Sequence, residues 1–156
     1  MVRVPKPQRG LVFRYGYIWL KDWQKGRRTP GKDRPACIVL QLDERRARML
    51  GVEGGEPPEG GHVVILPITR SPPGADDVAV ELSVDDKRAC GLDPTTPSWV
   101  VVSEFNADMW PSPDMAAVPG GDRFEYGHAP PGLLRRILTA FQDAYVQKPG
   151  RGVGRR

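Results

Sequence analysis

The sequence has few of the residues that build metal centres and disulfide frameworks. Its 156 residues include two cysteines and two histidines, and neither Cys37 nor Cys90 has a metal-ligand neighbour. No apolar run approaches the roughly 18 residues of a membrane span, and no apolar segment follows the basic residues near the start. We therefore expect a cytoplasmic protein without a metal or other cofactor, in which both thiols are reduced.

Signatures of several common enzyme classes are also missing. The sequence contains no phosphate loop ending in Lys-Ser/Thr, no Gly-x-Ser-x-Gly, no His-Glu-x-x-His and no Cys-x-x-Cys pair. No glycine-rich turn joins a strand to a helix in the way that dinucleotide binding needs. These absences argue against P-loop hydrolases, α/β-hydrolases, zinc proteases and dinucleotide-dependent enzymes.

Glycine and proline are abundant instead, with 18 and 17 residues, and they favour short strands joined by turns over a helical bundle. The strand at 35–42 has an unbroken apolar centre, which indicates burial on both faces. Runs of β-forming residues predict further strands at 11–23, 63–69, 78–83, 98–105 and 123–126. Because the alternation of strands and helices typical of α/β folds is missing, we expect a mainly β protein, with a small curled antiparallel sheet or barrel.

Two helices complete this prediction. Ser83 and Asp86 have the spacing of a helix N-cap, and Gly91 ends the short helix that follows. A C-terminal amphipathic helix at 129–146 places its apolar residues on one face, namely Leu133, Leu134, Ile137, Leu138, Phe141 and Tyr145.

The chain reads as one domain over residues 10–146. We expect a flexible basic lead-in at 1–9, a surface insertion at 43–61 and a flexible basic tail at 147–156.

Charge is unevenly distributed, although the net charge is only +4. Residues 1–34 contain ten Lys and Arg against two Asp, a net charge of +8. Residues 35–146 have nine basic and seventeen acidic residues, a net charge of −8, and residues 147–156 add +4. This segregation indicates a basic surface for a polyanion such as a nucleic acid, although for the last ten residues we favour a flexible arm.

Two residues at strand ends are candidates for phosphate binding. Arg34 stands at the start of the strand predicted at 35–42, and Thr69 ends the strand at 63–69. A guanidinium is always charged and matches a phosphate in shape, while a threonine hydroxyl can donate to a phosphate oxygen. Together they could stabilise a pentacoordinate transition state without a metal. The alternatives are structural: Arg34 as a strand-end charge or salt bridge to Asp33, and Thr69 as a turn residue.

Three stretches of the sequence share their pattern with one protein family. Gly16-Tyr17-Ile18-Trp19-Leu20 matches the family's first strand, and Gly31 to Val39 matches its Gly-Lys-x-Arg-Pro-x-x-Val signature. Val64 to Thr69 matches its third strand, with Arg70 where a Ser is usual. Over residues 10–110 the chain therefore resembles the MazF/PemK (Kid) family of type II toxin–antitoxin ribonucleases.

The resemblance implies a small SH3-like antiparallel barrel of the CcdB/PemK/MazF type that forms a homodimer. It also implies a growth-inhibiting toxin that cleaves single-stranded RNA, such as mRNA, at selected sequences without a metal, and that a cognate antitoxin protein inhibits. In this family the RNA 2′-hydroxyl attacks the adjacent phosphorus and leaves a 2′,3′-cyclic phosphate. The family's catalytic residues correspond to Arg34, which would neutralise the phosphorane and donate a proton to the leaving oxygen, and to Thr69, which would hold a phosphate oxygen.

The resemblance further implies that the loop at 21–32 forms the basic rim of the RNA site. Trp23 is a candidate for stacking on an unpaired base, and alternatively it is a core residue at the mouth of the barrel. The cations are expected to contact phosphates rather than read the sequence. The RNA-binding candidates are Trp23, Lys25, Arg27, Arg28, Lys32 and Arg70.

No residue is assigned as the general base. Some family members use an Asp in the fifth strand, and the corresponding position is Ser103. Glu104 is adjacent, but in a regular strand it would point to the opposite face. His62 and His128 lie before a strand and in a Gly/Pro stretch, where we do not expect an acid–base role.

Two other functions stay open. A CcdB-like gyrase inhibitor shares the barrel but acts through a Trp-containing C-terminal end, whereas this C-terminus has no aromatic residue. A nucleic-acid-binding module without turnover is the second alternative, because the fifth-strand Asp is missing. The long segments at 43–61 and 111–128 could reshape the RNA groove or alter antitoxin docking.

Overall fold

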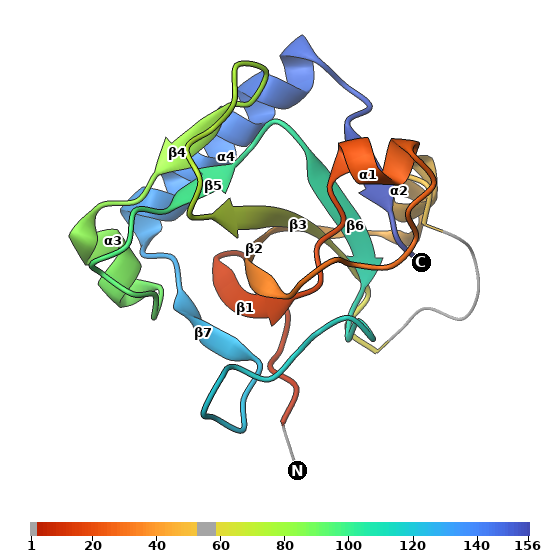
Figure 1. The fold of residues 1–156 in the computed structure, drawn as a ribbon. Helices are drawn as coiled ribbons and strands as arrows, with labels where there is room; N and C mark the ends of the chain where they lie inside the picture. The colour runs from red at the N-terminus through yellow and green to blue at the C-terminus, as the bar shows by residue number, and fades with distance from the viewer. Residues whose placement is uncertain (1–2, 53–58) are drawn as a thin grey trace.

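The computed structural model describes residues 3–52 and 59–156, and these form a mainly β protein (Figure 1), as predicted. The strands are β1 (Leu11–Tyr15), β2 (Arg34–Leu42), β3 (His62–Thr69), β4 (Ala79–Glu81), β5 (Trp99–Val101), β6 (Phe105–Met109), β7 (Glu125–His128) and β8 (Gly152–Gly154). The helices are α1 (Leu20–Gln24), α2 (Glu44–Met49), α3 (Val84–Ala89) and α4 (Pro131–Gln147).

The strands form one curled sheet in the order β4-β5-β3-β2-β1-β7, with antiparallel neighbours. β6 pairs antiparallel with the first half of β3, and β8 runs parallel to β6. Within the described residues this sheet does not close into a barrel, so of the two forms predicted from the sequence, a curled antiparallel sheet or a barrel, the structure has the sheet. The end of α3 lies against β7, where a Cβ built on Gly127 would be 2.8 Å from the Ala89 oxygen, so only glycine fits there.

The core has two parts, one on each face of β2 and β3. Because side chains alternate along a strand, Ile38 belongs to one cluster and Val39 to the other, which confirms that the strand at 35–42 is buried on both faces. The larger cluster lies beneath α4, and the smaller one packs around the fully buried Trp110. Cys37 and Cys90 are buried free thiols in the larger cluster, as expected for structural cysteines.

Both predicted helices are confirmed. Ser83 and Asp86 form a capping box at the start of α3, and Gly91, with φ of 76°, ends it. α4 buries Leu133, Ile137 and Phe141, as the helical spacing of its apolar residues predicted. Tyr145, which belongs to the same apolar set, is 41% exposed. No helix among the described residues has the length and apolar character that crossing a membrane requires.

Two predicted strands have different boundaries. The strand expected at 11–23 ends at Tyr15, because the Asn106 side chain binds the backbone N–H and C=O of Ile18 at 3.1 and 2.8 Å and so replaces a neighbouring strand. The strand expected at 98–105 is divided into β5 and β6 by a bend at 102–104.

Within the described residues, the segments 3–9 and 147–156 both contact the rest of the protein, where the sequence predicted flexible basic arms. In the lead-in, the carbonyls of Pro5 and Pro7 accept hydrogen bonds of 2.9 and 3.0 Å from the Trp110 and Gln41 side chains. The tail contains β8, and Arg155 is only 7% exposed. The tail is ordered because β6 offers a free strand edge and because buried carboxylates accept from its arginines.

The predicted insertion at 43–61 is only partly at the surface. α2 begins after an Asp43 cap, and it buries Ala47 in the larger core cluster together with Val52. Residues 53–58 of this segment lie outside the described residues.

Candidate functional site

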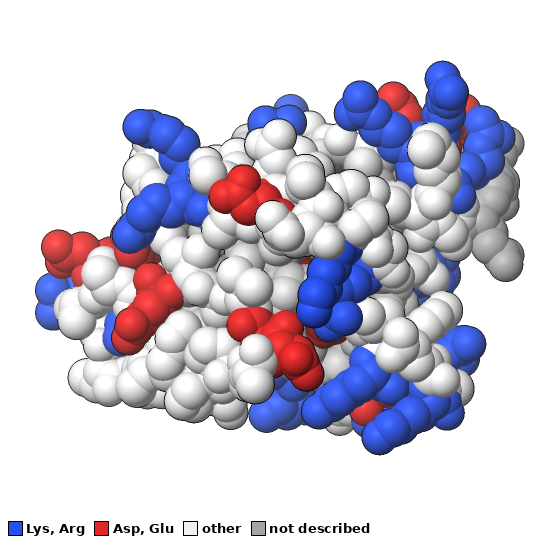
Figure 2. Space-filling model, turned by 90° about the horizontal axis from the view of Figure 1, so that it is seen from above, with Lys and Arg blue, Asp and Glu red and all other residues white. Residues whose placement is uncertain are grey.

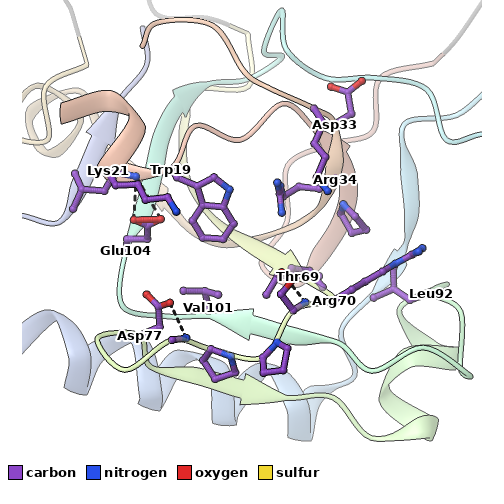
Figure 3. Close-up of a pocket in the computed structure, with 18 of the residues that line it drawn as sticks. Trp19, Lys21, Asp33, Arg34, Thr69, Arg70, Asp77, Leu92, Val101 and Glu104 are labelled. Carbon is purple, nitrogen blue, oxygen red and sulfur yellow. Dashed lines mark hydrogen bonds between the residues drawn. The ribbon is translucent and has the colours of Figure 1, made fainter. Parts of the chain in front are cut away.

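A cleft of about 910 Å³ opens where β2 begins and β3 ends. It is formed by segments far apart in the sequence, because the antiparallel pairing of β2 and β3 brings the start of one strand to the end of the other. Figure 3 shows charged, hydroxyl and aromatic side chains around this space. Those used below are Trp19, Lys32, Arg34, Thr69, Arg70 and Glu104.

Arg34 and Thr69 lie opposite each other at the ends of β2 and β3. Ala36 pairs with Pro67, and two residues outward along each antiparallel strand are Arg34 and Thr69. Residues two apart share a face of a strand, so the register sets these side chains across from each other. Both line the cleft, and Figure 3 shows them at the same end of it. The structure therefore brings the two predicted phosphate-binding candidates to one cleft, while their roles stay predictions.

The Arg34 guanidinium is half-buried and lacks an acidic partner. Among residues 3–52 and 59–156 its Nε is buried without a hydrogen bond, and the ion pairs there do not include Arg34. Asp33, the alternative partner, points away from it in Figure 3. Burial lowers the pKa of Arg34 from its ordinary value, because the cation loses hydration. An anion entering the cleft would replace part of this lost hydration.

Arg34 and Thr69 each make a further contact at this end of the cleft. The Arg34 Cζ lies 5.0 Å from the centre of the Trp19 ring, within the range of a cation–π interaction. The Thr69 Oγ1 accepts a hydrogen bond of 3.1 Å from the Ser71 backbone, so Thr69 has the turn role weighed as its alternative. Its hydroxyl proton can still be donated to a group in the cleft.

The structure divides the predicted RNA-binding residues into two groups. Lys32 and Arg70 are exposed and line the cleft. Lys25, Arg27 and Arg28 are exposed on and after α1 but do not line it. Their predicted role as contacts to a longer phosphate backbone stays a prediction.

Trp23 also lies outside the cleft, and its ring is covered. The Arg28 Cζ stands 3.8 Å from the centre of the Trp23 ring, and Arg28 donates a hydrogen bond of 2.9 Å to the Trp23 carbonyl. Trp19 is the tryptophan at the cleft, between Arg34 and Glu104 in Figure 3. The sequence pattern does not mark Trp19 as a site residue, although it belongs to the matched stretch at 16–20.

Glu104 is the second cleft residue to which the sequence assigned no role. It is 5% exposed, and the backbone N–H of Leu20, the first residue of α1, donates to its carboxylate at 3.1 Å. Burial raises the pKa of Glu104 to about 7, and the hydrogen bond from Leu20 offsets part of that effect. Ser103 does not line the cleft, and its Oγ accepts from the Val78 backbone at 3.0 Å.

Charge gathers unevenly on the face shown in Figure 2. Lys and Arg side chains are concentrated toward the right of this view, the side where α1 and α2 lie in Figure 1, while several Asp and Glu lie nearer the centre. The predicted basic surface from the first 34 residues is thus visible around α1, joined by the arginines of α2.

No group of three or more His, Cys, Asp or Glu in the described part of the chain is arranged to hold a metal ion. His62 and His128 do not line the cleft. By its fold and cleft, this is a mainly β protein with a cleft at the ends of two central strands, lined by six basic, five acidic and two aromatic residues. In comparisons with known proteins, no family model and no curated protein matches the chain.

Proposed function

We propose that this protein is a metal-independent endoribonuclease that cleaves single-stranded RNA at selected sequences. The observation that carries the proposal is the pairing of Arg34 with Thr69 across β2 and β3, with a guanidinium that has no acidic partner among the described residues. A phosphodiester matches both groups, because it is anionic and presents acceptor oxygens.

The cleft also fits single-stranded RNA better than a free phosphate. Trp19 offers a ring for stacking beside the phosphate-binding groups, and unpaired bases are commonly held in this way. Lys32 and Arg70 extend the positive charge along the rim of the cleft. Sequence selection would come from base contacts rather than from these cations.

The reaction that these residues support is transesterification within the RNA. The 2′-oxygen attacks the adjacent phosphorus, the bond from phosphorus to the 5′-oxygen breaks, and a 2′,3′-cyclic phosphate and a 5′-hydroxyl result. Arg34 neutralises the charge that develops on the phosphorane and donates a proton to the leaving oxygen. Thr69 donates a hydrogen bond to a non-bridging oxygen. Preorganised donors of this kind stabilise a transition state more than the bound substrate.

The biological role that we propose is that of the toxin of a type II toxin–antitoxin system. It rests on the order of the Gly31–Val39 and Val64–Thr69 motifs, which the structure places on β2 with its leading loop and on β3. In this proposal the sheet is an open variant of the SH3-like toxin barrel, the protein acts in the cytoplasm as a homodimer, and a cognate antitoxin inhibits it.

The test is cleavage of a diverse pool of single-stranded RNA by the purified protein in the presence of a chelator. We expect cleavage with 2′,3′-cyclic phosphate ends, and a loss of at least about 100-fold in Arg34→Ala, since a transition-state donor contributes that much. Arg123→Ala removes an exposed cation outside the cleft and should cleave normally. An inert wild type that also fails to slow growth on overexpression would overturn the proposal, and RNA binding without cleavage would favour the non-catalytic module.

A further inference from the structure

A bulge between β5 and β6 changes the direction of Glu104. On β3, Ile65 pairs with Asn106 and Ile68 pairs with Val100. Between these two pairs, β3 has two residues, 66–67, whereas the segment that joins β5 to β6 has five, 101–105. This segment therefore contains three extra residues, which form the bulge. The alternation of a regular strand therefore fails at 102–104, and Val101 and Glu104 both line the cleft. Bulges of this kind often re-aim a side chain beside an active site.

Glu104 is buried without an ion pair among the residues that the structure describes. The backbone N–H of Leu20 donates to its two carboxylate oxygens, at 3.1 and 3.5 Å. A buried carboxylate is costly. The start of α1 favours a negative acceptor, but a neutral amide oxygen can also accept from the Leu20 N–H, so holding α1 does not require an ionisable group at this position.

Glu104 and Arg34 stand on opposite sides of the Trp19 ring in Figure 3, and all three line the cleft. In an in-line displacement at phosphorus, the attacking and leaving oxygens lie on opposite sides of the phosphorus. A base and an acid that serve the two oxygens must therefore approach from opposite sides. RNA bound along the cleft would therefore have Arg34 toward one side and Glu104 toward the other.

We infer that Glu104 is the general base of the cleavage reaction, an inference that rests on the proposed ribonuclease function. The Glu104 carboxylate takes the proton of the 2′-hydroxyl as the 2′-oxygen bonds to phosphorus. As the bond to the 5′-oxygen breaks, Arg34 gives that oxygen a proton. Exchange with solvent then returns a proton to Arg34 and removes one from Glu104. The step produces the cyclic phosphate and the 5′-hydroxyl with no further reactant.

The groups around Glu104 suit this role. Burial, together with Asp77, raises its pKa to about 7, and Leu20 N–H, Arg151 and Lys21 lower it. Tyr17, whose own pKa Glu104 helps to raise, also lies near it and stays protonated near neutral pH. A base that titrates near pH 7 is ionised in part of the molecules and still strong enough to accept a proton.

The first experiment compares single-turnover cleavage by the wild type and Glu104→Gln at saturating RNA across pH 5 to 9. The amide keeps an acceptor for the Leu20 N–H but cannot take a proton. We expect a loss of at least about 100-fold in kcat, with RNA affinity unchanged within threefold. The wild-type rate should rise tenfold per unit below pH 7 and level off above it, and the residual rate of the variant should lack this rise.

A second pair of variants leaves Glu104 in place, so it stays decisive even where Glu104→Gln does not fold. Asp77→Asn should lower the apparent pKa of the rate profile and Arg151→Gln should raise it, each by roughly half a unit. Full activity of a folded Glu104→Gln, or profiles that do not move in these variants, would overturn the inference. If Arg34→Ala abolishes cleavage under those same conditions, the proposed ribonuclease function is supported and only the role of Glu104 as general base is rejected. A wild type that cleaves no RNA overturns both.

Discussion

The Arg155 guanidinium donates a hydrogen bond of 2.9 Å to the Tyr15 hydroxyl and so joins the end of the chain to the end of β1. The same Nη1 donates to the Gly16 carbonyl at 2.8 Å and to the Asn106 Oδ1 at 2.9 Å. Asn106 in turn holds the backbone of Ile18, directly before Trp19. The tail therefore fixes the segment that carries the aromatic side of the cleft.

Arg155→Ala should destabilise the protein by about 3 kcal/mol. Arg155 also pairs with Asp114, and removing one partner of a buried charged network leaves polar groups without donors. Urea unfolding followed by circular dichroism measures the change. Lys148→Ala, which removes an exposed cation from the same segment, should change the free energy of unfolding by less than about 0.5 kcal/mol. Equal stability of the two variants would show that the network does not stabilise the fold.

The order of the tail could not be predicted from composition alone. Its glycines and cations suggest a solvated arm, but its partners Asp108 and Asp114 are 41 to 48 residues away in the chain. Only the folded chain brings these acids to the arginines of the tail, where β8 pairs with β6. Local sequence patterns predict local structure, whereas these ion pairs depend on tertiary packing.

Trp19→Leu should weaken RNA binding by about 5- to 100-fold in Kd, because stacking on one base contributes roughly 1–3 kcal/mol. Leucine keeps apolar bulk against Tyr17, whose ring lies 5.2 Å away, but removes the flat ring. Trp23→Leu is the matched control and should change Kd by less than about threefold, since Trp23 does not line the cleft. Fluorescence anisotropy with a labelled RNA, in the Arg34→Ala background to prevent cleavage, measures both. The reverse ranking would restore Trp23 as the stacking residue.

Much of the candidate site followed from strand patterns, and the rest depended on an irregularity. Arg34 and Thr69 could be placed together because both stand at the ends of well-formed strands. Glu104 could not, because the regular alternation assumed at 98–105 turns it away from Ser103, whereas the three-residue bulge brings it into the cleft. A bulge is hard to predict from a single sequence. The short helix α1, which begins after Ile18 where a strand was predicted, is equally hard to predict.

Thr69→Val should reduce kcat by about 10- to 100-fold while RNA binding changes little. The substitution keeps the β-branched shape and removes the hydroxyl that would donate to the phosphorane, a single transition-state contact. Thr69→Ser restores the hydroxyl and should recover most of the activity. Because Thr69 also accepts from Ser71, the thermal stability of each variant is compared. Equal activity of the Val and Ser variants would assign Thr69 to the turn alone.

The protonation of Glu104 should also be visible in stability, independently of any activity. Its pKa rises from an ordinary value of 4.5 to about 7 in the folded protein, so between these pH values the folded state holds a proton that the unfolded state has lost. Stability must therefore fall as pH rises through this window, by about 3 kcal/mol at 1.36 kcal/mol per pH unit, and level off above it.

Urea unfolding of the wild type and Glu104→Gln at intervals between pH 4.5 and 8 measures this contribution. The difference between the two curves isolates Glu104, because the other titrating groups are common to both proteins. We expect the wild type to lose stability relative to the variant up to pH 7, since glutamine cannot ionise. Two curves that run parallel over the whole range would mean that Glu104 titrates at the same pH in the folded and unfolded chain.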